Sequence, residues 1–233
     1  MIFHWRFANK DLYGAYIATV RDLMNSSTAK LIVDVGGGNQ CPFARYRSPG
    51  TKIVAVDLSE EAMASNHDVD ERRVADVVHE GLPFGDDEVD LVTSRAVLEH
   101  LTDVEVFTRE TARVLRSGGH AVHVFPGRNS SFAVANRMLG NRRSRALLHA
   151  LLPQFEGICG FPAYYDHCSP RAIRKAIERS GLKVELIDVS YFGSHYYKFF
   201  LPVFLISAAY EKMISAIGNE ELSAYVLAIA LKT

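Results

Sequence analysis

The sequence predicts an α/β protein with a doubly wound, mostly parallel sheet of seven strands. Short apolar runs of strand length alternate with segments whose apolar residues recur at helical spacing along most of the 233 residues. The first run, Leu31–Val35, leads into glycines 36–38, and the second, Lys52–Asp57, ends on a carboxylate. Strands joined in series by helices form right-handed crossovers, so we expect parallel strands with helices on both faces of the sheet.

Periodicity and turn residues place the elements of the first half. Between the glycines and the second strand, Pro42 and Pro49-Gly50 leave room for only a short crossover helix. Ser59 is a suitable cap for a short helix after the second strand. In chain order we expect a helix over Asp11–Met24, the first two strands, a third strand over Arg73–Asp76, a fourth over Val89–Ser94 and a helix over Val97–Leu115 that stops at Arg116–Gly119.

The second half begins with a fifth strand, His120–Phe125, which Pro126-Gly127 ends. The alternation then stops, and we interpret residues 127–167 as an insertion within a single domain spanning residues 1–233. Ser169 and Pro170 open the next helix, as cap and first helical residue. The remaining elements are that helix through Arg179, a sixth strand over Lys183–Val189, an apolar helix around Phe199–Ile217 and a last strand over Ala224–Ala230.

Polar residues and glycines follow several of the predicted strands. In sheets of this kind ligands bind at the carboxyl ends of the strands, so these residues converge on one edge. The separation of roughly 20 residues between the glycines and Asp57 is the one at which a carboxylate meets the ribose hydroxyls of a nucleotide. The two strand ends therefore outline a nucleoside site.

Four separated stretches carry a resemblance to a known family, and they span about residues 30–125: Asp34–Asn39, Val56–Ser59, Ala75–Val77, and Leu82–Phe84 with Val89–Leu101. In these stretches the chain resembles the class I S-adenosylmethionine-dependent methyltransferases, in the small-molecule branch that includes ubiquinone and sterol methylating enzymes. The sequence departs from the family pattern at Gln40, where a third glycine is often found. The resemblance implies a Rossmann-like methyltransferase fold in which residues 127–167, after the fifth strand, form a helical lid on the substrate side.

The resemblance also implies S-adenosyl-L-methionine as cofactor, no metal, and a role for each matched residue. Asp34 and glycines Gly36, Gly37 and Gly38 would hold the methionyl part, and Asp57 would bind both ribose hydroxyls. Leu58 and Val77 would enclose the adenine, Asp76 would accept a hydrogen bond from its amino group, and the backbone around Ser94 and Arg95 would meet the methionyl amine.

Methyl transfer from a sulfonium needs mainly the alignment of the nucleophile, so no universal catalytic residue is expected. A hydroxyl acceptor requires a base, and histidine is the default candidate because of its pKa near neutrality. His100, after the fourth strand, and His167, in the predicted lid, are the two candidates. We expect Glu99, next to His100, on a helix surface.

Charge and composition limit the partners. Lys plus Arg number 26 against 27 Asp plus Glu, so nucleic acid is not expected as a main partner. Five arginines and no acid between Arg128 and Leu152 favour a small-molecule or lipid-linked acceptor that is anionic, or peripheral contact with a membrane surface; the alternative is a solvated basic face over an apolar stripe. Three separated cysteines without a C-x-x-C pair, Cys41, Cys159 and Cys168, favour reduced thiols in the cytoplasm.

Three other functions stay open at this point. An NAD(P)-dependent oxidoreductase would carry Gly-x-Gly-x-x-Gly, whereas here Cys41 stands at the third position and the following helix is too short to receive a pyrophosphate. A non-catalytic module that binds S-adenosylmethionine or S-adenosylhomocysteine would keep the glycines and Asp57. A purely structural or interaction protein would bind no nucleoside.

Overall fold

The computed structural model describes residues 11–26, 29–140, 142, 162–193 and 201–233. Seven strands form one sheet in the order β3-β2-β1-β4-β5-β7-β6, in which β7 runs antiparallel to both of its neighbours and the other pairs are parallel. The predicted doubly wound fold is confirmed. The strands are β1 (Leu31–Val35), β2 (Lys52–Asp57), β3 (Glu71–Val74), β4 (Val89–Arg95), β5 (Leu115–Pro126), β6 (Lys183–Ser190) and β7 (Tyr225–Leu231).

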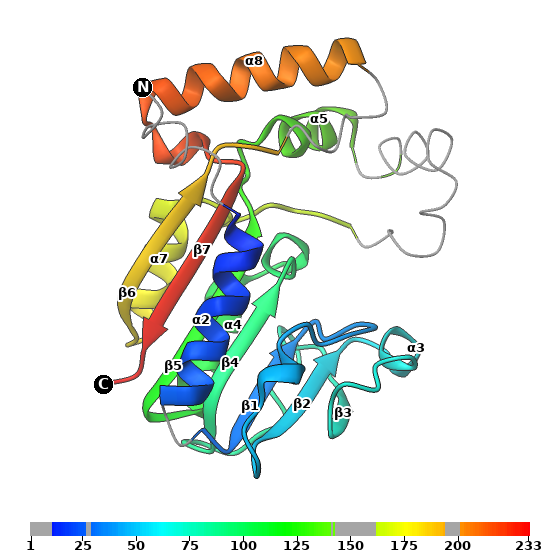
Figure 1. The fold of residues 1–233 in the computed structure, drawn as a ribbon, viewed down its shortest axis with the longest axis vertical. Helices are drawn as coiled ribbons and strands as arrows, with labels where there is room; N and C mark the ends of the chain where they lie inside the picture. Colours follow the sequence, from blue (N-terminus) through cyan, green and yellow to red (C-terminus); the bar gives the residue numbers. More distant parts are fainter. Residues whose placement is uncertain (1–10, 27–28, 141, 143–161, 194–200) are drawn as a thin grey trace.

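Helices cover both faces of the sheet, and two more lie beyond its carboxyl edge (Figure 1). The α-helices are α2 (Leu12–Ser26), α3 (Glu60–Met63), α4 (Val104–Val114), α5 (Ser131–Leu139), α7 (Pro170–Arg179) and α8 (Leu201–Ile217), and the 3-10 turns are η1 (Ala44–Tyr46), η2 (Leu98–His100) and η5 (Glu220–Leu222). The short crossover predicted between β1 and β2 is confirmed, since it contains only η1.

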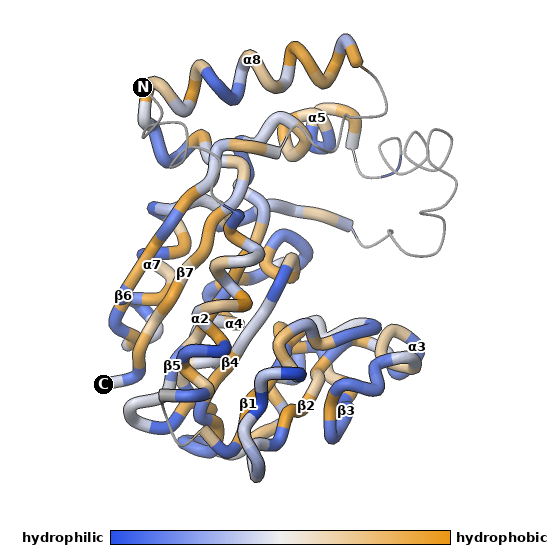
Figure 2. The backbone as a smooth tube through the Cα atoms, in the orientation of Figure 1, coloured by the Kyte–Doolittle hydropathy of each residue, from blue (hydrophilic) through white to orange (hydrophobic). Residues whose placement is uncertain are grey.

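Two apolar layers result from the alternation of side chains along the central strands. On β1, Ile32 points to the layer that α2 covers, and Val33 points to the layer covered by α4 and α7. Because both faces are covered, the central strands are apolar almost throughout, and they form the orange stretches of Figure 2.

The helix predicted over Val97–Leu115 is wrong in its extent. Its first part is the single turn η2, and α4 starts anew after Asp103, whose carboxylate caps it by accepting from Val106 N at 2.9 Å. The helix also ends earlier, at Val114, because β5 already begins at Leu115. Residues 116–119 belong to an irregular part of β5, with Gly118 at φ +78°, and do not stop a helix.

The third strand was predicted over Arg73–Asp76, and its observed bounds are shifted toward the N-terminus, to Glu71–Val74. Asp76 closes a turn of its own, since its Oδ1 accepts from Val78 N at 3.0 Å and from His79 N at 3.1 Å. A carboxylate that bonds to the following backbone in this way competes with the strand ladder.

Residues 141 and 143–161 of the predicted lid, with Arg143, Arg145 and Cys159, lie outside the described residues, as does Phe199. The described beginning of the lid is α5, which Ser130 caps and Gly140 ends. Within the described ranges, no helix combines the length and apolar character needed to cross a membrane.

Asp90 ties the amino ends of three strands together. Its Oδ2 accepts from Lys30 N and Leu31 N, each at 2.8 Å, at the start of β1. Its Oδ1 pairs with Arg116 at the start of β5, and the carboxylate is only 9% exposed. A single buried acceptor thus supports the edge of the sheet opposite the one at which ligands bind.

We therefore expect Asp90→Ala to lower the free energy of unfolding by about 2–3 kcal/mol, because two backbone donors and a guanidinium lose a charged acceptor. Urea denaturation followed by circular dichroism measures this change. The matched control is Asp86→Ala, whose carboxylate also pairs with an arginine but is 75% exposed, and it should cost under about 0.5 kcal/mol. Equal losses in the two variants would contradict the role assigned to Asp90.

Candidate active site

The three glycines after β1 turn the chain sharply back onto β2. Gly36 has φ +68°, a conformation that side chains with a Cβ rarely adopt, and its N donates to Val56 O at 2.7 Å. A Cβ on Gly37 would lie 2.6 Å from Ala55 Cβ. The backbone therefore follows the end of the sheet more closely than a residue with a side chain would permit.

Asp57, at the carboxyl end of β2, is bonded to this loop. Its Oδ2 accepts from Gly38 N at 3.1 Å, and its Oδ1 accepts from Leu58 N at 2.8 Å. Each carboxylate oxygen keeps further acceptor capacity, because it receives one of these two hydrogen bonds and has two lone pairs. The neighbouring Leu58 side chain is 53% exposed. The loop, the carboxylate and an apolar side chain thus meet at one point of the edge.

Asp34, at the end of β1, lies beneath the loop and is buried. Thr93 Oγ1 donates to its Oδ1 at 2.9 Å. Burial raises the pKa of Asp34 to about 6, against the opposing effects of the Thr93 hydrogen bond and the positive charge of Arg95. At neutral pH the carboxylate is therefore ionised but poorly solvated, and a nearby cationic group would stabilise it.

The other predicted cofactor residues lie at the ends of β3 and β4. Asp76 is partly exposed, and although burial opposes its ionisation, hydrogen bonds from His79 and Val78 hold its pKa below the usual value. Val77 beside it is buried. The Ser94 side chain is buried, and its Oγ lies 2.8 Å from His123 Nδ1.

Sequence reasoning missed His123 and Thr93 because nothing in their local pattern separates them from ordinary strand residues. Burial lowers the pKa of His123 to about 4, so this histidine is neutral and supports Ser94 from within the sheet. The registers Asp34↔Thr93 and Ser94↔His123 bring each pair together. The one signal that could have indicated Thr93 and His123 was the presence of polar residues near the ends of strands that were predicted to be neighbours.

His100 is held by the segment that returns to the edge after the undescribed part of the lid. Its Nδ1 lies 2.9 Å from Pro162 O, and since a carbonyl only accepts, Nδ1 carries the hydrogen. Burial lowers the pKa of His100, so the ring is neutral at pH 7 and its lone pair is on Nε2. A neutral imidazole with a fixed tautomer has the properties of a general base.

The segment Pro162–Ser169, which we call the strap, is also bonded to the residue before His100. Tyr164 N and Tyr165 N donate to Glu99 O at 2.7 and 3.2 Å, and Arg128 N donates to Cys168 O at 2.7 Å. The strap therefore connects the turn after β4 to the residues that follow β5.

Glu99 is buried under the strap, so the expected position on a helix surface is wrong. Its side chain is 5% exposed, and burial raises its pKa to about 8. The Glu99 carboxyl group is therefore protonated at neutral pH. Burial also raises the pKa of the neighbouring Cys168 thiol, and the charge that Glu99 takes at higher pH adds to that effect.

His167 lies at a different place from His100. Its Nδ1 is 3.0 Å from Asp166 Oδ2 and its Nε2 is 3.8 Å from Glu105 Oε1. It lines a cavity of about 280 Å³ between the N-terminal ends of α4 and α7. None of the residues that line this cavity belongs to the glycine loop or to the ends of β1 and β2.

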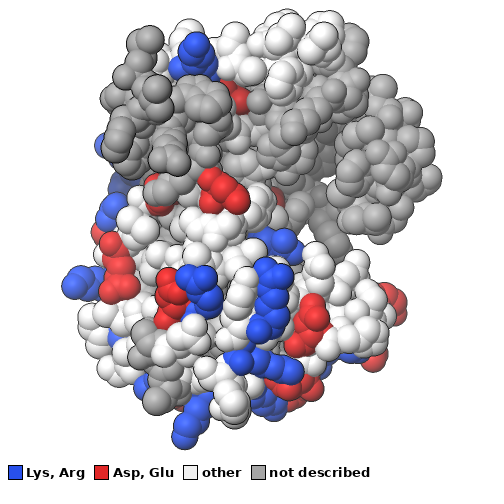
Figure 3. Space-filling model, in the orientation of Figure 1, with Lys and Arg blue, Asp and Glu red and all other residues white. Residues whose placement is uncertain are grey.

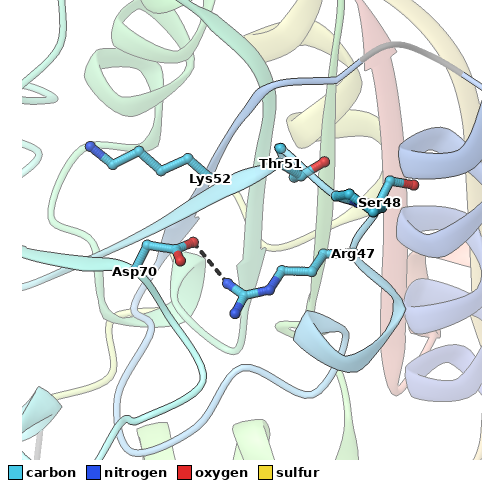
Figure 4. Close-up of a pocket in the computed structure, with 7 residues that line it drawn as sticks. Arg47, Ser48, Thr51, Lys52 and Asp70 are labelled. Carbon is cyan, nitrogen blue, oxygen red and sulfur yellow. Dashed lines mark hydrogen bonds and ion pairs between the residues drawn. The ribbon is translucent and has the colours of Figure 1, made fainter.

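A larger cavity, of about 620 Å³, lies at the opposite edge of the sheet, beside the amino end of β2 (Figure 4). Its charged groups are already paired: Arg47 with Asp70 at 2.8 Å, and Lys52 with Glu71 at 2.5 Å. Ligands of open α/β sheets bind at the carboxyl ends of the strands, so we place the active site at the glycine loop.

The sequence profile of a methyltransferase domain matches residues 33–123, which include the glycine loop, Asp57 and His100. Among curated proteins, the chain is 33% identical to sarcosine/dimethylglycine N-methyltransferase of Halorhodospira halochloris over 104 residues, or 41% of this chain and 37% of that protein. It is 31% identical to demethylmenaquinone methyltransferase of Mycolicibacterium paratuberculosis over 104 residues, 44% of each. Residues 33–123 therefore form a methyltransferase domain of the S-adenosylmethionine-dependent kind.

Solved structures share the fold of this methyltransferase. Geranyl diphosphate C-methyltransferase from Streptomyces coelicolor A3(2) superposes with a TM-score of 0.59 at 16% identity, over 95% of this chain and 81% of that one. Phosphoethanolamine N-methyltransferase 2 of Haemonchus contortus gives a TM-score of 0.59 at 14% identity, over 94% and 52%. The matched stretches span less than half the length of the curated relatives.

The residues of the methyltransferase at this edge suit S-adenosylmethionine, the methyl donor of the family. Asp57 has acceptor capacity for two hydroxyl groups, Leu58 offers an exposed apolar surface for a purine, and an ammonium group would stabilise the charge of the buried Asp34 carboxylate. Thus the chemistry of the donor and acceptor set fits this cofactor.

Replacing Asp57 tests the cofactor assignment. Asp57→Ala removes both the acceptor for the ribose and the bond to Gly38 N, so we expect the affinity for S-adenosylmethionine to fall at least 100-fold, as two or more charge-assisted hydrogen bonds of about 1.5–3 kcal/mol each are lost. Isothermal titration calorimetry measures this loss. The exposed Asp86→Ala serves as control, and an affinity unchanged by Asp57→Ala would mean that the ribose lies elsewhere.

The buried Glu99 predicts an unusual pH dependence of stability. Its pKa of about 8 in the folded protein exceeds its ordinary value of 4.5, so the unfolded chain releases a proton that the folded one retains. The free energy of unfolding should fall as pH rises between these values, by up to about 1.4 kcal/mol per pH unit. Urea denaturation at pH 5 and 8.5 measures this fall.

In Glu99→Gln the slope between these pH values should largely vanish, because the replacement does not titrate. Glu60→Gln, at the exposed start of α3, provides the control and should keep the slope of the unmodified protein. A Glu99→Gln variant with an unchanged slope would show that another group titrates.

Proposed function

We propose that the protein transfers a methyl group from S-adenosylmethionine to a small-molecule acceptor in the cytoplasm. The observation that carries this proposal is the hydrogen bond from Gly38 N to Asp57 Oδ2, which joins the carboxylate that would bind the ribose to the glycine loop of the methyltransferase domain. S-adenosylmethionine supplies an activated methyl group on a sulfonium. The role of the chain is to hold the acceptor in line with it, an effect worth up to about 7–11 kcal/mol.

Each predicted cofactor residue has a role consistent with its place in the fold. Asp34 and glycines 36–38 orient the methionyl part, with the backbone at Ser94 and Arg95 beside them. Leu58 and Val77 enclose the adenine. Asp76 would receive the adenine amino group, and this requires one of its oxygens to accept a further hydrogen bond beyond those within its own turn.

His100 is the better candidate for a base if the acceptor reacts through a hydroxyl. Its proton is fixed on Nδ1 by Pro162 O, and its position after β4 is at the carboxyl edge of the sheet. The other candidate, His167, lies beside Asp166 and Glu105, in a cavity whose lining includes no residue of the glycine loop.

The acceptor class that we favour is apolar or lipid-linked and carries an anionic group. Residues 127–167 would form the lid, and their described parts, α5 and the strap, both adjoin the carboxyl edge. A relative in fold is crystallised with geranyl diphosphate, an isoprenoid that carries an anionic group. The arginine content of the lid sequence supports an acceptor of this kind.

The function is tested by incubating the protein with S-adenosylmethionine that carries a labelled methyl group and with separate polar and lipid extracts. Label should appear in a low-molecular-weight product, together with S-adenosylhomocysteine. Tight cofactor binding without any labelled product in either extract would favour the non-catalytic binding module. Absence of cofactor binding would refute both the methyltransferase and the non-catalytic binding module.

Two substitutions at His100 separate its chemical role from its structural one. His100→Asn provides an N–H that can donate to Pro162 O but has no basic nitrogen, whereas His100→Ala loses both. For a hydroxyl acceptor we expect both variants to lose about 10²–10⁴-fold in kcat, the usual contribution of general-base catalysis, with the Asn variant keeping the KM for cofactor. Full activity of His100→Asn would assign the histidine a structural role only.

A further inference from the structure

Helix α8 has its polar side chains on the inside. Ser207, Glu211 and Ile214, spaced by four and three residues, form its buried face. Glu211 Oε1 accepts from Gly193 N at 3.0 Å, just after β6, and from Ser207 Oγ at 3.3 Å. Ser207 Oγ lies 3.0 Å from Ser131 Oγ of α5. Polar contacts therefore fix α8 to the rest of the protein.

The outward face of α8 is apolar, the reverse of an ordinary surface helix. Figure 2 shows long hydrophobic stretches along this helix at the end of the molecule beyond the sheet. The exposed fractions are 63% for Leu201, 56% for Leu205, 70% for Ile206, 54% for Met213 and 64% for Ile217, with Met138 at 83% and Leu139 at 42% on neighbouring α5. We call this set the α8 apolar surface.

The exposed charged side chains on α5, α8 and residue 142 are all basic. Over α5, α8 and residue 142, the exposed charged side chains are Arg137, Arg142 and Lys212, and the one acid of these segments, Glu211, is buried. The first exposed acid beyond α8 is Glu220. In Figure 3 charges of both signs mix over the lower part of the visible face, and the described atoms at the α8 end are mostly white, with some blue and red among them.

We propose that the α8 apolar surface docks onto an anionic lipid bilayer, with α8 lying in the plane of the interface. An apolar helix face bordered by Lys and Arg has the composition of an interfacial helix, since the apolar side chains enter the acyl region while the cations contact lipid phosphates. A second copy of the chain suits the surface less well, because a twofold contact would bring Arg137, Arg142 and Lys212 near their own equivalents.

The surface has a direct relation to the active site through α5. This helix follows β5 at the carboxyl edge of the sheet, and Ser131, its first residue, contacts α8. A docked protein would therefore turn its carboxyl edge toward the membrane. The docking itself does not depend on methyl transfer, so it stands or falls separately from the proposed activity.

Vesicle co-sedimentation tests the proposal with the full chain. We expect the protein to bind vesicles of phosphatidylcholine and phosphatidylglycerol in equal parts, and to bind pure phosphatidylcholine vesicles at least tenfold more weakly in 0.1 M salt. Leu205→Ser combined with Ile206→Asp should reduce binding to the mixed vesicles at least tenfold. Leu186→Ser, at a 44% exposed apolar position on β6, is the matched control and should bind as the unmodified protein does.

Circular dichroism and calorimetry with S-adenosylmethionine show whether the double variant remains folded, since neither substituted residue touches the cofactor edge. Absence of binding of the unmodified protein to mixed vesicles would overturn the proposal. A dimer in light scattering that the double variant converts to a monomer would overturn it also, by assigning the surface to a second copy.

Discussion

The site depends on one carboxylate that bonds to two segments of backbone. Asp57 ends β2 and accepts from Gly38 N and Leu58 N, so a single side chain fixes the glycine loop of the first strand against the turn of the second. The loop can reach it because Gly36 takes a positive φ and Gly37 leaves no room for a Cβ against Ala55. The position of the Asp57 carboxylate therefore depends on the glycines at 36 and 37 and on the pairing of β1 with β2. A change in any of the three would move the other two.

Burial affects the two carboxyl groups of the site, Asp34 and Glu99, to different extents. Asp34 and Glu99 are both buried carboxyl groups, but Asp34 keeps a pKa of about 6 with help from Thr93 and Arg95, whereas Glu99 rises to about 8 under the strap. At neutral pH the first is an anion beneath the glycine loop and the second is neutral. The protein thus presents negative charge where the cofactor amine is expected and a neutral carboxyl group at Glu99 beneath the strap.

The sequence predicted most of the fold and the cofactor edge, because these depend on local patterns. Strand runs, Ser59, Ser169 and Pro170 all act within a few residues, and the structure has them where expected. The errors arose where distant contacts decide. The burial of Glu99 comes from the strap, which lies some 60 residues further along the chain, and no periodicity near Glu99 indicates it. The pairing of Ser94 with His123 likewise required the register of β4 and β5.

The antiparallel strand β7 has a consequence for the order in which the chain acquires its structure. It lies between β5 and β6, yet it is synthesised after both, and its Val226 pairs with Phe125, about a hundred residues earlier. During translation, β6 therefore has no ladder partner within the sheet until β7 has left the ribosome, and the half built from β1 to β5 can assemble first. Such late, long-range closure slows folding, and it leaves the edge of β5 open to wrong strand partners for the interval.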